Sequence, residues 1–328
     1  MHLKGVIILE ISNKLKERFC KDCNIPIKMF YEPFFTSRLE LFQPFYESND
    51  KYQLFLDSYE KAGYQNEQEY FEDYNRIKDE AINFIKNSDA YKRFNSCDMN
   101  EFVVNTDLPS TDIYKPSNDG KTFISIDMKK ANFSALSHYD SNMFDNCSTW
   151  EDFMSNFTDN QHIVNSKYIR QVILGNCNPK RHIAYEKFLT YKLFTYLNEQ
   201  LNFKDKVVFF SNDEIVISVN NTDSFIFENI TTAVNNFSSL SNIKFKVTLF
   251  TLHSIEGTKG YYKDIYSPTC SYHQYEFKCL EPYQFPFVLR AARGESMRFL
   301  DNYFEYEGNV AMFSGSLGIK MPILVSVV

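Results

Sequence analysis

Residues 122–128 read TFISIDM and follow the turn-forming sequence SNDG. β-Branched and aromatic residues next to a turn signal predict a strand, with Asp127 at its end. Residues 207–219 read VVFFSNDEIVISV. Two strand-like runs joined by the polar SNDE sequence predict a hairpin, with Asp213 and Glu214 at its turn. These two stretches decide the fold.

The elements around these stretches predict an α+β fold. Helices are expected at about 160–174, 179–201 and 224–237, and a strand at 243–252. A capping box at Ser148-x-x-Glu151 predicts a short helix up to residue 157. The order strand, helices, hairpin, helix, strand builds an antiparallel sheet with helices on one face.

The chain divides into three predicted regions. Residues 1–115 have helical periodicity and form a mainly helical N-terminal region that ends in the turn-rich sequence LPSTDIYKPSNDG. Residues 116–268 hold the α+β elements, and residues 269–328 form a C-terminal extension. Aromatic residues of this extension, such as Phe285 and Phe287, are expected in the core rather than as platforms for bases.

Composition bears on the compartment and on membrane partners. The longest early apolar run is too short to span a bilayer and contains Glu10, so no membrane partner is expected. Seven scattered cysteines suit a reducing compartment, which favours the cytoplasm or another intracellular location. Cys20-x-x-Cys23 lacks a second ligand pair nearby and is expected to pack rather than to bind zinc.

The net charge of −7 is unevenly distributed along the 328 residues. Residues 47–80 hold ten acids against four bases, and this segment is a candidate surface for a protein partner. Residues 160–206 hold eight bases against three acids. This stretch can meet phosphates, although charge counting alone favours a solvated helix face.

Asp127, Asp213 and Glu214 are the candidate catalytic acids. Each ends or interrupts an apolar strand, where an ionised carboxylate is costly unless a cation or another group offsets it. Asp127 and Asp213 on neighbouring strands can bind two Mg²⁺ or Mn²⁺ ions for phosphoryl transfer. The alternative is that the acids only form the turn.

Two segments resemble the palm motifs of family A DNA polymerases and the related single-subunit phage-type RNA polymerases. Residues 126–138, IDMKKANFSALSH, are similar to the family's DYSQIELRVLAH, and residues 210–219, FSNDEIVISV, are similar to VHDELVFEV. The resemblance covers roughly residues 120–265. It implies that Asp127 and Asp213 bind the metal ions and that Glu214 supports the site.

A third segment, residues 167–178 with the sequence KYIRQVILGNCN, resembles the family's triphosphate-binding helix. The resemblance implies that Arg170 replaces the family's lysine, and Lys167 and Arg181 are expected to help bind the nucleotide. The alternative for Arg170 is a surface helix residue. Asn178 stands where the family has an aromatic residue near the end of this helix.

Further departures from the family pattern affect substrate contacts. Asn132 stands where DNA polymerases place a glutamate against the ribose 2′-hydroxyl, so the choice of sugar is open. Asn212 replaces the histidine before the last metal-binding acid. The spacer before the hairpin is short, which implies reduced fingers.

The predicted function is that of a nucleic-acid polymerase or nucleotidyltransferase. It would add nucleotides from NTPs or dNTPs to a DNA or RNA primer, with or without a template, by two-metal phosphoryl transfer. The alternative is a catalytically inactive palm that acts as a nucleic-acid-binding, structural or interaction protein. Reverse transcription and nucleotide cyclisation are further reactions that a palm can support.

Overall fold

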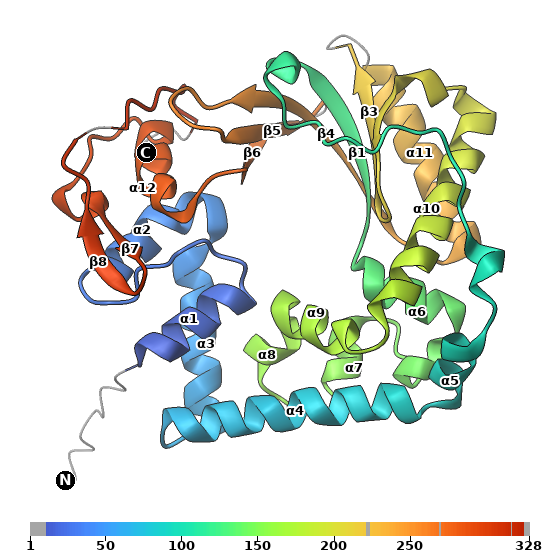
Figure 1. Ribbon diagram of the computed structural model, residues 1–328, viewed down its shortest axis with the longest axis horizontal. Coiled ribbons are helices and arrows are strands. Elements are labelled where there is room, and N and C mark those ends of the chain that lie inside the picture. Colours follow the sequence, from blue (N-terminus) through green and yellow to red (C-terminus); the bar gives the residue numbers. More distant parts are fainter. Residues whose placement is uncertain (1–10, 221–223, 269, 316, 325–328) are drawn as a thin grey trace.

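A six-stranded antiparallel sheet forms one side of the molecule (Figure 1). The computed structural model describes residues 11–220, 224–268, 270–315 and 317–324. The strand order β2-β3-β1-β4-β5-β6 places β1 between β3 and β4. The strands are β1 (Thr122–Met128), β2 (Val207–Phe210), β3 (Glu214–Val219), β4 (Phe245–Ser254), β5 (Tyr261–Ser267) and β6 (Cys270–Lys278). The predicted α+β class, the strand at 122–128 and the hairpin at 207–219 are confirmed.

The two faces of the sheet have different neighbours, because side chains alternate along each strand. Ile124 and Ile126 are fully buried in the main core, which α6 (Ala131–Tyr139), α10 (Pro179–Leu201) and α11 (Ser224–Ser241) help to form. Phe123 belongs to a smaller apolar cluster, separate from that core. Ser125 and Asp127 follow it at alternate positions and line a cleft. One face therefore builds the core and the other carries polar groups.

The predicted helix at 160–174 is wrong as a single element. The structure has α8 (Gln161–Asn165) and α9 (Lys167–Gly175), which are separated by Ser166 in an extended conformation. The Ser166 side chain accepts a hydrogen bond from the Ile169 N–H and so starts a new helix. Apolar periodicity runs through this break, because α8 buries Ile163 and Val164 and α9 buries Ile169, Ile173 and Leu174.

The ends of three other elements differ from the prediction. Thr149, not Ser148, caps α7 (Trp150–Met154), which ends three residues before the predicted position. The helix predicted at 224–237 continues to Ser241, and the strand predicted at 243–252 is β4. The helix that starts at Pro179 and runs to Leu201 is confirmed.

The N-terminal region is helical, as predicted, and reaches around to the far edge of the sheet (Figure 1). Phe45 of α2 contacts Phe277 of β6 with ring centroids 5.3 Å apart, and Phe42 contacts Phe285 at 5.7 Å. In the described ranges, no helix combines the length and apolar character needed to cross a membrane. The helices are α1 (Asn13–Asp22), α2 (Phe34–Tyr46), α3 (Ser48–Ala62), α4 (Glu67–Asn87) and α5 (Asp89–Ser96).

A buried carboxylate joins this region to α8 and α9. Asp22 at the end of α1 accepts hydrogen bonds from the hydroxyl groups of Tyr74, at 3.1 Å, and Ser166, at 2.8 Å. The His162 Nε2 atom lies 3.2 Å from the same carboxylate. Because Ser166 also starts α9, Asp22 fixes where that helix begins.

The C-terminal region continues the sheet and then closes against α2. The boundary expected at residue 268 falls between β5 and β6, which are paired with each other. Asp301 is buried between two arginines, with the Arg38 Nη1 atom at 2.7 Å and the Arg290 Nε atom at 2.8 Å. The elements are α12 (Phe285–Ala292), β7 (Tyr303–Tyr306) and β8 (Asn309–Met312). Short 3₁₀ helices are Met99–Phe102, Pro116–Asn118, Ser141–Phe144, Lys204–Lys206, Pro282–Gln284 and Phe299–Asn302.

Candidate functional site

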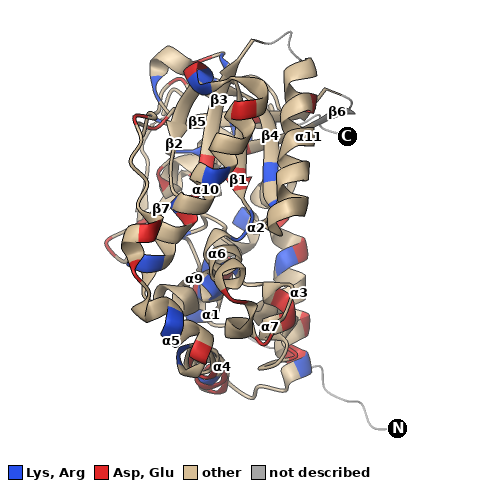
Figure 2. Cartoon of the chain, turned by 90° about the vertical axis from the view of Figure 1, so that its right-hand side faces the viewer, with Lys and Arg blue, Asp and Glu red and all other residues tan. Residues whose placement is uncertain are grey.

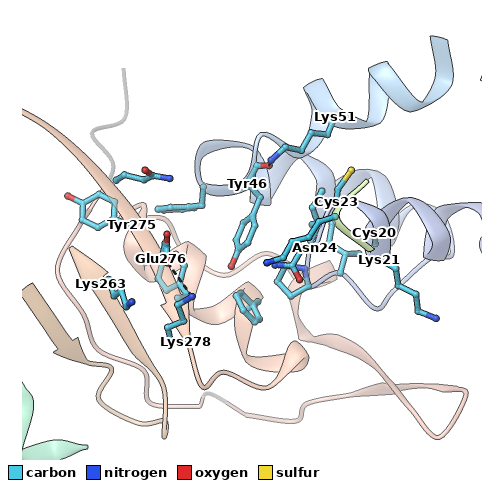
Figure 3. Close-up of a pocket in the computed structure, with 18 of the residues that line it drawn as sticks. Cys20, Lys21, Cys23, Asn24, Tyr46, Lys51, Lys263, Tyr275, Glu276 and Lys278 are labelled. Carbon is cyan, nitrogen blue, oxygen red and sulfur yellow. Dashed lines mark hydrogen bonds and ion pairs between the residues drawn. The ribbon is translucent and has the colours of Figure 1, made fainter. Parts of the chain in front are cut away.

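A cleft of about 880 Å³ lies between the polar face of the sheet and the N-terminal helices. Figure 3 shows part of it, with Lys263, Glu276 and Lys278 from the sheet on one side and Tyr46 and Lys51 from the helices on the other. Seven lysines and four acids line the whole cleft, so its walls are basic in a chain that is acidic overall. Such a cleft favours an anionic ligand.

Asp127 and Glu214 lie side by side on the sheet wall of this cleft. They are direct partners in the antiparallel register of β1 and β3, so both side chains leave the sheet on the same face. The Ser125 hydroxyl donates to Glu214 Oε1 at 2.5 Å. Burial, together with the charges of Asp213 and Glu214, raises the pKa of Asp127 to about 6. Lys263 and Lys167 oppose this rise.

Asp213 occupies the turn beside this pair. Its carbonyl oxygen accepts a hydrogen bond from the Met128 N–H at 2.8 Å, and its carboxylate accepts one from the Ser211 hydroxyl at 3.1 Å. Burial is the main cause that raises the pKa of Asp213, and the charges of Glu186 and Glu214 contribute. Its side chain is not part of the cleft lining. The fold therefore brings the three predicted acids close enough for their charges to interact.

Carboxylate oxygens are the ligands that Mg²⁺ prefers, and a bound cation would relieve the repulsion between these acids. Asp127 and Asp213 are the two acids to which the sequence prediction assigns such ions. Among the residues that the structure describes, no group of three or more His, Cys, Asp or Glu side chains is arranged to hold a metal ion. The two-ion site thus stays a prediction.

Glu186 is a buried acid behind the turn that sequence reasoning missed. Its Oε2 accepts a hydrogen bond from the Asn212 side-chain amide at 2.8 Å, and its Oε1 lies 2.9 Å from His182 Nδ1. The Thr190 hydroxyl donates to the Asn212 carbonyl at 2.8 Å. Helix α10 therefore fixes the residue before Asp213. The available signal was the position of Glu186 on the apolar stripe that continues at Leu189 and Leu193.

Lys263 on β5 is the second residue that sequence reasoning missed. Its ammonium lies 4.5 Å from the centroid of the Phe250 ring and 5.9 Å from that of Tyr114. Lys263 is only 8% exposed, and burial lowers its pKa although Glu214 opposes the change. The signal in the sequence was that Lys263 lies two residues from both Tyr261 and Ile265, the spacing of side chains on one face of a strand.

The predicted nucleotide-binding residues have different positions. Lys167 is exposed at the first turn of α9 and lines the cleft. Arg170 lies one turn further on and outside the cleft lining. Burial lowers its pKa, and Glu151 is the charged group that opposes this change. Arg181 donates to the carbonyl oxygens of Phe94 and Cys97, so its guanidinium holds the end of α5.

Neither predicted asparagine lines the cleft. Asn132 Oδ1 accepts a hydrogen bond from the Phe133 N–H at 2.9 Å, within the first turn of α6. The Asn178 side-chain amide donates to Asn95 Oδ1 at 2.6 Å at the start of α10. Of the five residues predicted to bind the nucleotide, Lys167 alone shares the cleft with Asp127. Cys20 and Cys23, which also line it, are free thiols.

The acidic segment 47–80 is remote from the candidate acids along most of its length. It forms α3 and α4, and α4 lies at the end of the molecule opposite the sheet (Figures 1 and 2). Arg76 pairs with Asp73 and Glu80 on this helix, so part of the charge is balanced locally. A protein partner for this surface stays a prediction.

Comparisons with protein families, curated proteins and solved structures found no match for this chain. The α+β fold is therefore established by the geometry of the chain itself. The resemblance to polymerase palms rests on the three sequence segments described above.

Proposed function

We propose that this chain is a nucleotidyltransferase of the polymerase type. One observation carries the proposal: Asp127 and Glu214 are paired across two strands, beside Asp213, on one wall of a lysine-lined cleft. Acids gathered at one point suit divalent cations, and lysines around them suit phosphates. The substrates are NTPs or dNTPs and the 3′-hydroxyl of a DNA or RNA strand.

Each residue has a defined task in this proposal. Asp127 and Asp213 would hold Mg²⁺ or Mn²⁺, which when bound activates the attacking hydroxyl and neutralises charge on the phosphates. Glu214 accepts a hydrogen bond from the Ser125 hydroxyl, and this bond supports the register of β1 and β3 beside Asp127. Lys167 is exposed in the cleft, so its ammonium can contact the triphosphate.

A primer-extension assay tests the proposal. The full chain is incubated with Mg²⁺ or Mn²⁺, ribo- or deoxyribonucleotides, and a primer with and without a template. We expect incorporation by the wild type and a loss of at least about 100-fold in Asp127→Ala and Asp213→Ala, because each removes a metal ligand. The matched control is Asp205→Asn, which changes an exposed acid outside the cleft.

Two results would count against the proposal in different ways. Equal incorporation by the wild type and both alanine variants would eliminate the assigned mechanism. No incorporation under any condition would favour the alternative that the chain is an inactive palm that binds nucleic acid.

A further inference from the structure

Four lysines of the cleft form no close ion pair with the acids that the structure describes. No described carboxylate lies within 4.0 Å of the ammonium groups of these lysines, which are Lys28, Lys167, Lys246 and Lys263. The other three lysines that line the cleft do have partners. They form pairs Lys21–Glu17 at 2.7 Å, Lys51–Glu47 at 3.3 Å and Lys278–Glu276 at 3.2 Å.

The unpaired lysines come from both walls of the cleft. Lys28 follows α1 and Lys167 begins α9, on the helical side. Lys246 lies on β4 and Lys263 on β5, on the sheet side. The acids of the cleft act on these ammonium groups only at longer range, as Asp127 does on Lys263 and Lys167. An anion between the walls could therefore form closer ion pairs with the lysines than these acids do.

Lys246 places this charge directly beside the candidate catalytic acids. It is the register partner of Asp127 on β4, as Glu214 is on β3, so the three side chains form a row across the sheet. Lys246 is exposed to solvent and has no ion pair with Asp127. It is therefore free to meet a phosphate next to the row.

Tyrosines line the same space. Tyr46 of α2 and Tyr275 of β6 are both part of the cleft wall in Figure 3, and Tyr168 follows Lys167 on α9. Aromatic rings beside a basic groove are platforms on which unpaired bases stack. A nucleic-acid strand offers both groups that such side chains bind, phosphates for the ammonium groups and bases for the rings.

We infer that the cleft binds a single nucleic-acid strand through its phosphates, with Lys28 on the helical side and Lys246 on the sheet side. A free triphosphate is compact, whereas the unpaired lysines lie on two facing walls and so match a chain of phosphates. The strand site rests on the proposed function, because it lies in the same cleft. It also includes Lys28, which lies outside the palm-like segment. Binding of the strand needs no turnover.

Fluorescence anisotropy with labelled 20-nucleotide single-stranded DNA and RNA tests the inference on the full chain. Lys28→Ala and Lys246→Ala are compared with Lys86→Ala and Lys180→Ala, two exposed lysines outside the cleft. We expect each cleft variant to weaken binding about threefold to tenfold and to reduce the slope of log K against log salt by about 0.7. The control variants should bind as the wild type does. Thermal melting verifies that every variant is folded.

The outcomes separate this inference from the proposed function. Cleft variants that keep the affinity and salt slope of the wild type would overturn it. It would also fail if the free nucleoside triphosphate displaced the strand completely, or if duplex bound far more tightly than single strands. We expect Asp127→Ala to bind the strand as the wild type does. If strand binding depends on the cleft lysines but no variant incorporates nucleotides, the proposed function is contradicted and the strand site is not.

Discussion

Replacing Asp127 by asparagine should stabilise the protein at neutral pH. The pKa of Asp127 is raised from its usual 3.8 to about 6, chiefly by burial and then by the charges of Asp213 and Glu214. In the folded chain the ionised form is therefore less favourable than in the unfolded chain. Asparagine keeps the shape and removes the charge, so the destabilising contribution disappears.

The magnitude follows from linkage between proton binding and folding. A difference of one in pKa between the folded and unfolded chain corresponds to about 1.36 kcal/mol. The difference between about 6 and 3.8 therefore corresponds to about 3 kcal/mol of destabilisation at pH 7.5. Asp127 is partly exposed to the cleft, and solvent screening reduces this to about 1–2 kcal/mol. The folded chain binds more protons than the unfolded chain between the two pKa values. The contribution is therefore nearly complete above about pH 7 and shrinks to about a third at pH 4.5.

Thermal melting of wild type, Asp127→Asn and the control Asp205→Asn at pH 7.5 and pH 4.5 measures this effect. At pH 7.5 we expect the melting temperature of Asp127→Asn to rise by about 2–4 °C for each kcal/mol gained. The rise should be much smaller at pH 4.5, and Asp205→Asn should change little at either pH. A rise of equal size at both pH values, or none at pH 7.5, would refute the electrostatic reasoning.

Three further predictions concern buried polar groups. Asp22→Ala removes the acceptor of a buried hydrogen-bond network and should cost about 3–5 kcal/mol in urea unfolding, whereas Asp22→Asn should cost less. Glu186→Ala leaves the Asn212 amide without its acceptor and should cost about 1–3 kcal/mol, with Glu186→Gln closer to the wild type in the same measurement. Lys263→Met removes a cation that lowers the pKa of Asp127. The pH dependence of nucleotide incorporation should therefore move to higher pH. An unchanged pH profile would exclude this electrostatic role of Lys263.

Much of the α+β region could be predicted from local sequence. The strand with Asp127 and the hairpin with Asp213 have apolar runs bounded by turn formers, and both are confirmed. The pairing of these segments was expected from their order, and the register of Asp127 with Glu214 shows it. Local chemistry was sufficient here because every signal favoured the same structure.

Other parts depend on contacts between distant residues, which periodicity does not encode. Ser166 interrupts a helix whose apolar pattern is continuous, because its hydroxyl both caps α9 and donates to Asp22. Arg181 looked like a phosphate ligand, but it holds carbonyl groups of α5, nearly 90 residues earlier in the sequence. Lys263 and Glu186 reach the site only through the tertiary fold. Sequence patterns locate charges along the chain and leave their partners open.

Helix α2 is made early in synthesis of the chain, but its packing partners in the C-terminal region are made late. The buried pair of Arg38 and Asp301 joins residues 263 positions apart. At about 5–20 residues per second, a ribosome takes roughly 13–53 s to make the second partner after the first. During that interval the apolar surface of α2 around Phe42 has no covering partner from α12. We therefore expect nascent chains to associate with chaperones until α12 and Asp301 have emerged.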